Sequence, residues 1–344
     1  MKALPAMADP AASSGPASFW RCPACRGELV TTATSGRCHD CAATYACVGD
    51  ILDLRLPGAS WIDREADREY ARQLLANTDG APIEEVIRQV FAHRAGGDAA
   101  WVELRTRQFL QAPQRLQAEL RGWLRPIIGD DAFLDLGCGG GTLLAAAAAD
   151  GRSGIGIDVS LVWLVVARRL IAAHGGRPAL AAAMAEALPL ADGALAAVVS
   201  LDVIEHVADP VPYLREINRV TDSRGRIALA TPNRFSLTAE PHVLVWGVGW
   251  LPRRLQARYV AWRSGKSYDY TCLLSTRAAK LLLRAHTEFR FRIVLPQVTP
   301  EEIGRFPPWR ATLARLYNRM VVVPGCRWLF LLIGPFFRIV GTKA

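Results

Sequence analysis

The run FLDLGCGGGT, residues 133–142, constrains the fold of this chain more than any other stretch. An apolar segment that ends at Leu136 is typical of a buried strand, and Gly137, Gly139 and Gly141 follow it before an alanine-rich helical segment. A strand, a glycine turn and a helix in this order build parallel sheets, which bind ligands at such turns. The sequence therefore predicts an α/β fold with a ligand at this turn.

The spacing of the glycines indicates the kind of ligand. The dinucleotide fingerprint has glycines at its first, third and sixth positions, but Thr142 is at the sixth position here and the third glycine is Gly141. We therefore expect a ligand without a diphosphate. Further along, the apolar segment GIGIDVS contains Asp158, where an acidic side chain can accept hydrogen bonds from both hydroxyls of a ribose. The two segments together predict a ligand that contains a ribose.

Four segments in order resemble the class I S-adenosylmethionine-dependent methyltransferases, in particular the ubiquinone-biosynthesis O-methyltransferases. They are FLDLGCGGG (133–141), GIDVS (156–160), AEALPLADGALAAVVSLDVIEHVADP (185–210) and GRIALATPNR (225–234). The resemblance implies a Rossmann-like seven-stranded sheet with S-adenosylmethionine across the carboxyl ends of its strands. The family often has Asp where this chain has Met184, so the adenine amino group lacks a carboxylate acceptor there.

The resemblance also assigns the cofactor contacts. Asp158 is expected at the ribose, and the turn from Gly137 to Gly141 beside the methionine end of the cofactor. The full expected set is Asp135, Gly137, Cys138, Gly139, Gly141, Asp158, Val159, Met184, Ala185, Glu186, Leu201, Asp202 and His206.

Four of the eight cysteines form two Cys-x2-Cys pairs. Cys22 and Cys25 are followed by Cys38 and Cys41, a spacing that lets four thiolates converge on Zn²⁺ in tetrahedral geometry. We expect a structural zinc site with these four ligands. The pairs and the following YACVGDILDLRLP resemble the zinc ribbon of tRNA-methyltransferase activator proteins and of some rRNA guanine methyltransferases.

Composition and periodicity divide the 344 residues into five expected units, one of them a large core. The first unit, residues 1–18, is rich in Pro, Ala and Ser and lacks the apolar core of a signal peptide, so we expect a disordered leader on a cytoplasmic protein. The others are a zinc ribbon at 19–60, a helical connector or cap at 61–125, a methyltransferase core at 126–298 with an insertion at 232–272, and a basic apolar tail at 299–344.

Within the core, alternating apolar and helical segments predict a parallel sheet. Strands are expected at 132–136, 153–159, 179–184, 195–201 and 226–231, and helices at 141–150, 160–174 and 275–286. The segment 289–298 is expected to be a further strand, and the sequence does not reveal its antiparallel partner.

The net charge of +9 is concentrated in the C-terminal third, because residues 234–344 carry 18 Lys and Arg against 5 Asp and Glu. Such a surface suits nucleic acid, anionic lipid or an anionic small substrate. Two apolar stretches, VLVWGVGWL and VVVPGCRWLFLLIGPFFRIV, are too short or too interrupted to span a membrane. We expect peripheral membrane contact through 243–258 and 320–340.

Two histidines and a glutamate are candidates for activating the acceptor. Methyl transfer to a hydroxyl benefits from a general base, and His is the residue type best suited to this role at neutral pH. His206 follows the expected strand 195–201, and His242 lies in the insertion near Glu240, which could orient it. Helix capping or cofactor packing for His206, and an ordinary turn position for His242, are the alternatives.

The insertion also supplies candidate contacts to the acceptor. Asn233 is expected to cap the turn or bind the acceptor, and Arg234 to pair with a carboxylate or phosphate on it. Trp246 and Trp250 are expected in an apolar wall, VLVWGVGWL, that closes over the cofactor and excludes water.

The sequence favours an enzyme that methylates a small, apolar or lipid-linked acceptor, with O-methylation in secondary metabolism or envelope glycan assembly as the expected chemistry. An rRNA guanine methyltransferase is the alternative suggested by the ribbon. Residues 19–60 are close to neutral, however, and the insertion has no stripe of stacking residues, so nucleic acid is disfavoured as a partner. A non-catalytic cofactor-binding partner protein is a further alternative.

Overall fold

The computed structural model describes residues 19–57 and 62–344. The predicted leader, residues 1–18, lies outside the described residues.

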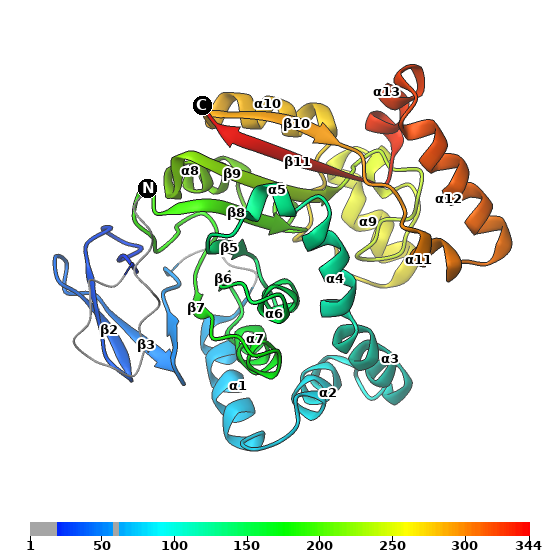
Figure 1. Cartoon of the computed structure of the whole chain (residues 1–344). Helices are drawn as coiled ribbons and strands as arrows, with labels where there is room; N and C mark the ends of the chain where they lie inside the picture. The colour runs from blue at the N-terminus through cyan, green and yellow to red at the C-terminus, as the bar shows by residue number, and fades with distance from the viewer. Residues whose placement is uncertain (1–18, 58–61) are drawn as a thin grey trace.

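Five parallel strands form the centre of the molecule (Figure 1). They are β5 (Phe133–Leu136), β6 (Gly154–Asp158), β7 (Ala179–Ala182), β8 (Leu195–Leu201) and β9 (Thr221–Pro232), and each of the five lies on a strand that the sequence predicts. Their order in space is β7-β6-β5-β8-β9, so the chain changes direction across the sheet after β7 and continues on the other side of β5. The glycine turn follows β5, at this change of direction, where open α/β sheets bind their ligands.

Helices cover both faces of the sheet because its strands bury side chains on both sides. On one face α6 (Thr142–Ala149) and α7 (Leu161–Ala173) pack in a core that includes Phe133 and Leu164. On the other face α8 (Pro210–Val220) and α10 (Thr276–His286) pack in a core that includes Leu134 and Tyr213. Ser160 caps α7, because its side chain accepts a hydrogen bond from the backbone N–H of Trp163.

Within residues 19–57 and 62–344 the sheet has eleven strands and not the seven that we expected. Seven of them run from β7 to β10, and four N-terminal strands extend the β7 edge in the order β1-β2-β3-β4. These are β1 (Leu29–Thr31), β2 (Ser35–Cys38), β3 (Thr44–Val48) and β4 (Ile51–Asp53). The difference arises because β4 pairs in parallel with β7, which joins the cysteine-bearing module to the central sheet.

The C-terminal boundary expected at residue 298 is wrong. Strand β11 (Phe336–Lys343) lies in the sheet, antiparallel to both β9 and β10 (Phe289–Val294), although the sequence placed it in a tail. It is the partner of 289–294 that the sequence did not reveal. Since β11 buries Phe337 and Ile339 in the core, residues 336–343 belong to the central sheet.

In the described part of the connector, five helices lie between the N-terminal module and β5. They are α1 (Arg64–Asn77), α2 (Ile83–Arg94), α3 (Ala99–Leu110), α4 (Ala112–Arg121) and α5 (Arg125–Ile128). Asp63 and Asp98 cap α1 and α3 by accepting hydrogen bonds from their first turns. The aromatic ring of Phe109 lies so close to Gly140 that a Cβ atom there would be 2.2 Å from it. The connector therefore covers the outer side of the glycine turn.

The remaining helices lie after β9 and β10. The predicted insertion contains the short helix η1 (Val248–Trp250) and α9 (Arg253–Ser264), and the chain between β10 and β11 forms α11 (Pro300–Gly304), α12 (Pro308–Val321) and α13 (Pro324–Ile333). Among the described residues, no helix has the length and apolar character needed to cross a bilayer.

Candidate active site

The glycine turn has the backbone geometry that only glycine adopts without strain. Gly137, Gly139 and Gly141 have φ values of 76°, 50° and 73°, all in the left-handed region. A Cβ atom on Gly137 would also lie 2.2 Å from the side chain of Val203. The turn is therefore packed directly against the loop that follows β8, and Cys138 within it is buried.

Asp158 lies at the carboxyl end of β6 and faces this turn. Its two carboxylate oxygens accept hydrogen bonds from the backbone N–H of Gly139 (2.8 Å) and of Ser160 (2.9 Å). Each oxygen keeps a further acceptor position, since a carboxylate has about four lone-pair sites in all. This is the geometry expected of a side chain that also accepts from two ribose hydroxyls.

Asp135 lies on the neighbouring strand β5 and is 4% exposed. Burial, and to a smaller extent the negative charge of Asp158, raises the pKa of Asp135 to about 8. Burial also raises the pKa of Asp158. The two carboxylates repel each other when both are charged, and Asp135 is the one that holds a proton at neutral pH.

The predicted residues after β7 and β8 lie on two loops that are joined by a hydrogen bond. Met184, Ala185 and Glu186 are half-buried, and the Glu186 carboxylate accepts from the backbone N–H of Ala208 (3.1 Å). Leu201 ends β8, and Asp202 follows it with a left-handed φ of 56°. These loops lie with the glycine turn and Asp158 at one edge of the sheet, and their contact with the cofactor stays a prediction.

A second group of side chains, which we call the histidine cluster, comprises Glu205, His206, Glu240 and His242. The Nε2 atoms of His206 and His242 are 3.1 Å apart, and Glu205 Oε1 is 4.0 Å from His242 Nε2. Glu240 Oε1 is 2.5 Å from His242 Nδ1, so it orients the ring as the sequence predicted. Tyr270 contributes its carbonyl oxygen, 3.1 Å from His206 Nδ1.

These contacts fix which nitrogen of each ring carries a proton. A carbonyl oxygen and a carboxylate only accept, so His206 Nδ1 and His242 Nδ1 are both donors. In their neutral forms both rings therefore present an Nε2 lone pair to the other. Two lone pairs at 3.1 Å repel unless one ring is protonated or a cation lies between them.

The pKa shifts indicate which ring takes the proton. Burial lowers the pKa of His206, and the hydrogen bond to Tyr270 does not compensate. Burial also acts to lower the pKa of His242, but the hydrogen bond and charge of Glu240 outweigh it, so the pKa of His242 is raised. His242 is therefore the stronger base of the pair.

The histidine cluster also has the composition of a metal site. Glu205, His206 and His242 each offer one ligand atom, and all three atoms lie within 4.8 Å of one another. Glu205 Oε1 is buried and has no hydrogen-bond partner among the described residues, while Oε2 accepts from Thr231 (2.9 Å). Backing of each imidazole Nδ1 by an acceptor is usual for histidines that bind metals. The atoms present thus fit a divalent cation.

Glu205 is the functional residue that our expectations missed. It directly precedes His206 in the sequence, and a glutamate beside a histidine after a buried strand was the available signal. Its proximity to His242 depends on how the insertion folds back, which sequence spacing does not reveal. The backbone N–H of Cys272 donates to the Glu205 carbonyl (2.7 Å) and attaches the end of the insertion there.

Two predicted acceptor contacts have structural partners instead. The Asn233 side-chain amide donates to the carbonyl of Leu332 (2.9 Å). The Arg234 guanidinium donates to the carbonyls of Gly249 (2.9 Å) and Leu251 (3.2 Å). Asn233 thus attaches to helix α13 and Arg234 holds the insertion together, and the pairing of Arg234 with an anionic group of the acceptor stays a prediction.

The predicted apolar wall alternates between the interior and the surface. Val243, Val245 and Val248 are buried in a small core with Val260 and Tyr268. Trp246 and Trp250 are 61% and 47% exposed, and their indole N–H groups donate to the carbonyls of Leu237 (3.0 Å) and Ser236 (3.1 Å). The two tryptophans therefore lie on the outside of the insertion, and they do not form the continuous inner wall that we expected.

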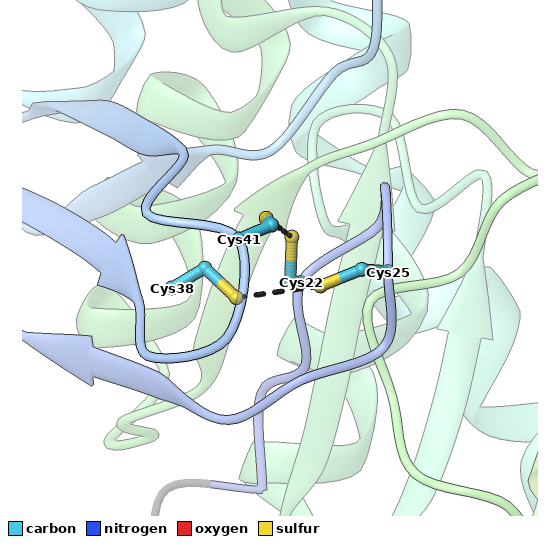
Figure 2. A group of neighbouring side chains, drawn as sticks. All are labelled: Cys22, Cys25, Cys38 and Cys41. Atoms are coloured by element: carbon cyan, nitrogen blue, oxygen red, sulfur yellow. Dashed lines mark hydrogen bonds between the residues drawn. The ribbon is translucent and has the colours of Figure 1, made fainter.

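The four N-terminal cysteines converge as their spacing predicted, with their sulfur atoms turned toward one another (Figure 2). Cys22 Sγ is 3.7 Å from Cys41 Sγ, and Cys25 Sγ is 3.4 Å from Cys38 Sγ. Four sulfurs at the usual Zn–S distance of about 2.3 Å would be roughly 3.8 Å apart in a tetrahedron. The cluster therefore has a size and ligand set that fit a structural zinc ion.

Comparisons with known proteins agree with this architecture. Residues 134–229 match the model of a methyltransferase domain family. A ubiquinone biosynthesis O-methyltransferase of Parvibaculum lavamentivorans is 35% identical over 130 residues, which cover 36% of this chain and 50% of that protein. The enzyme of the same name from a Pseudomonas aeruginosa strain is 39% identical over 105 residues, covering 29% of this chain and 44% of that protein.

The chain thus spans about half the length of the curated relatives it matches. Among solved structures, a S-adenosylmethionine-dependent methyltransferase of Thermotoga maritima aligns with a TM-score of 0.44 at 19% identity, over 71% of this chain and 97% of that chain. The family model and these relatives support a class I S-adenosylmethionine-dependent methyltransferase domain at residues 134–229.

Proposed function

We propose that this protein transfers the methyl group of S-adenosylmethionine to a hydroxyl group of a small, apolar or lipid-linked acceptor. The observation that carries the proposal is the position of the histidine cluster. Val203, three residues before His206, packs against Gly137, so the cluster lies beside the turn expected to hold the methionine end of the cofactor. The names of the ubiquinone O-methyltransferases support oxygen as the atom methylated. We propose secondary metabolism or envelope glycan assembly as the setting.

We assign the two ends of the cofactor to two parts of the site. Asp158 would accept hydrogen bonds from the ribose hydroxyls, and the turn from Gly137 to Gly141 would lie along the methionine end. The residues proposed to enclose the adenine and the sulfonium are those of the two loops that follow β7 and β8. The cofactor supplies an electrophilic methyl group, and this chain holds it in line with the acceptor oxygen.

His242 is the proposed general base. As the acceptor oxygen bonds to the methyl carbon, the carbon–sulfur bond breaks, and S-adenosylhomocysteine leaves as a neutral thioether. The hydroxyl proton passes to His242 Nε2, and the imidazolium that forms is stabilised by Glu240. The raised pKa of His242 strengthens it as a base but keeps it protonated to a higher pH.

The same atoms support a second way of activating the acceptor. A divalent cation held by Glu205, His206 and His242 would act as a Lewis acid and lower the pKa of an acceptor hydroxyl bound to it. Removal of the Glu205 carboxylate separates the two possibilities, because Glu205 is not in contact with the acceptor in the base mechanism. If the cation activates the acceptor, Glu205→Gln should abolish the stimulation of activity by an added divalent cation. The zinc site of the four cysteines should be unaffected.

We predict that His242→Ala lowers the methylation rate by about 10² or more and leaves cofactor binding unchanged. The rate of the unaltered protein should rise with pH through a value above 6.5, since the base must be deprotonated and its pKa is raised. The measurement is radiolabelled methyl incorporation into solvent extracts of small molecules from a deletion strain, with His286→Ala as the matched control.

Two results would overturn this assignment. Near-normal turnover by the His242→Ala protein would exclude His242 as the base. Incorporation into rRNA in preference to the small-molecule fraction would instead favour the alternative of a guanine methyltransferase.

We propose a cytoplasmic protein that contacts the membrane surface, and exposed apolar side chains support the membrane contact and a lipid-linked acceptor. Helix α13 is mostly apolar, yet none of its residues is buried. The exposed side chains on α12, α13 and their junction include Trp309, Leu313, Leu316, Val322, Val323, Trp328 and Leu332. Arginines lie among them, and tryptophan beside arginine is typical of segments that lie in the plane of an anionic membrane.

A further inference from the structure

Arg55 is a fully buried charge in the segment that follows strand β4. All five N–H groups of its guanidinium have acceptors. Nε and Nη2 donate to the two oxygens of Asp53 (2.7 and 2.8 Å), and Nη2 also donates to the carbonyl of Arg64 (3.4 Å). Nη1 donates to Asp67 Oδ2 (2.7 Å) and to the carbonyl of Val159 (3.0 Å). Arg55 therefore connects the N-terminal module, helix α1 and the loop after β6.

Asp67 extends these contacts to the start of α7. Its Oδ1 accepts from the Ser160 hydroxyl (2.8 Å), and its Oδ2 accepts from the backbone N–H of Leu161 (2.8 Å) as well as from Arg55. A carboxylate from a distant helix thus binds the first N–H group of α7, which has no partner within that helix. The loop from Val159 to Leu161 is held at three points by Arg55 and Asp67.

This loop is the one that positions Asp158. Val159 and Ser160 directly follow Asp158, and the Ser160 N–H donates to Asp158 Oδ1. A shift of the loop would therefore move the carboxylate that faces the glycine turn. Leucine or methionine would fill the volume of Arg55 without the expense of a buried charge, so packing alone does not explain this residue. The planar guanidinium with its five directed donors instead fixes the relative positions of the groups that accept from it.

Arg55 also has a close counterpart that lacks the contact with the loop. Arg68 on α1 donates through Nε (3.0 Å) and Nη2 (2.7 Å) to Asp53 Oδ2, and through Nη1 to Glu65 (2.8 Å). It shares the Asp53 partner with Arg55, but among the described residues it makes no hydrogen bond to residues 158–161. The two arginines and the two aspartates, Asp53 and Asp67, balance in charge.

We infer that Arg55 is a positioning residue for the cofactor, through which the cysteine-bearing N-terminal module forms part of the cofactor site. The inference rests on the ribose role proposed for Asp158. Arg55 acts on the cofactor by fixing the loop that carries Asp158, and it touches no ligand itself. A cofactor site that is fixed before binding loses less entropy on binding, which is how such a residue raises affinity.

The test is the affinity for S-adenosylhomocysteine, measured by calorimetry on the full chain. Arg55→Lys keeps the charge but cannot donate to all five acceptors. It should raise the Kd about tenfold, the scale of losing a residue that orients a ligand-binding side chain. Arg68→Lys is the matched control and should leave the Kd unchanged. If Arg55→Lys does not fold, Asp67→Asn breaks the same connection and should also raise the Kd.

A double-mutant cycle with Asp158→Asn separates positioning from general destabilisation. If Arg55 acts through Asp158, Arg55→Lys should have no further effect on the Kd in the Asp158→Asn protein. Additive effects, or equal Kd values for Arg55→Lys and Arg68→Lys, would overturn the inference while leaving the proposed function intact. An unchanged Kd in Asp158→Asn alone would instead remove the ribose assignment.

Discussion

Asp135, which is buried, and Asp158, which is half-buried, lie on neighbouring strands and differ in their hydrogen-bond partners. Asp158 accepts two backbone N–H groups, which favour its charged form. The pKa of Asp135 is raised to about 8, first by burial and then by the charge of Asp158. Asp135 therefore holds the proton, and Asp158 stays charged, as the ribose contact proposed for it requires.

This difference predicts how stability changes with pH. Because the folded-state pKa of Asp135 lies above its unfolded value of 3.8, the unfolded chain loses this proton first as the pH rises. The group therefore lowers the free energy of unfolding progressively between pH 4 and 8, by on the order of 5 kcal/mol in total. Asp135→Asn should remove this loss, so its stability relative to the unaltered protein should be greatest at pH 8.

Denaturant unfolding of the cofactor-free protein at pH 5 and pH 8 measures the effect, and the exposed Asp131→Asn is the control. If the free energy of unfolding depends on pH in the same way in the unaltered and the Asp135→Asn proteins, Asp135 is ionised in the folded state.

Single residues were predictable where local chemistry identifies them. The turn glycines, Asp158 and the four cysteines are set by spacing along the chain, and the structure brings each group together as expected. Glu205 and Arg55 were not predicted because the contacts that matter here, with His242 and with the carbonyl of Val159, join segments far apart in the sequence. A lone arginine in the apolar segment ILDLRLP was nevertheless a signal, since a charge among buried positions needs a partner.

At the scale of elements, the two cysteine loops repeat one backbone feature. The residue after the second cysteine of each pair, Arg26 and Ala42, has a positive φ, 65° and 57°. Both residues thereby turn the chain so that four sulfurs face one another. A non-glycine residue in this region is strained by about 1–2 kcal/mol, so other interactions must hold these loops in place, and a bound zinc ion would do so.

We predict that Cys25→Ser removes the bound zinc and lowers the unfolding temperature, because a structural site needs all four ligands. Cys47→Ser is the matched control, since Cys47 lies on the neighbouring strand β3 outside the quartet. Metal analysis and thermal unfolding of freshly purified protein measure the two effects. Unaltered protein that contains no zinc would contradict the assignment.

Elements with strong periodicity were predictable, and those that depend on distant pairing were not. From β5 to β8 each observed helix and strand lies within two residues of its predicted bounds. Strand β11 was hidden because it follows α13 in one apolar stretch, where helix and strand have the same composition. The pairing of β4 with β7 depends on the helical connector, and no local pattern reveals it.

At the scale of the whole molecule, the charge is divided between regions. The segment 19–60 is close to neutral, whereas residues 234–344 carry most of the positive charge. Helices α12 and α13 project from one end of the molecule, while α3 lies elsewhere on its surface (Figure 1). The exposed tryptophans and leucines of the projecting helices therefore form a surface distinct from the helical connector.

We predict that the protein binds vesicles that contain phosphatidylglycerol more strongly than vesicles of phosphatidylcholine alone, and that salt weakens the binding. Trp309→Ser with Trp328→Ser should weaken it about tenfold or more, because burial of a large apolar side chain contributes about 1.5–3 kcal/mol. Cosedimentation measures the effect, with Leu104→Ser on α3 as the control. Equal binding by the unaltered protein, the double tryptophan variant and Leu104→Ser would exclude this surface as the membrane contact. Self-association in light scattering would favour a second copy of the protein as its partner.

The position of β11 has a consequence for the order in which the protein can assemble during synthesis. Strand β10 leaves the ribosome before β11, yet its only strand partner among the described residues is β11, which separates it from β9. Until the segment from Phe336 onward emerges, β9 has an open edge and β10 has nothing to pair with. A nascent chain that stops before this point therefore exposes an unpaired strand edge, the kind of surface that invites aggregation and that molecular chaperones recognise.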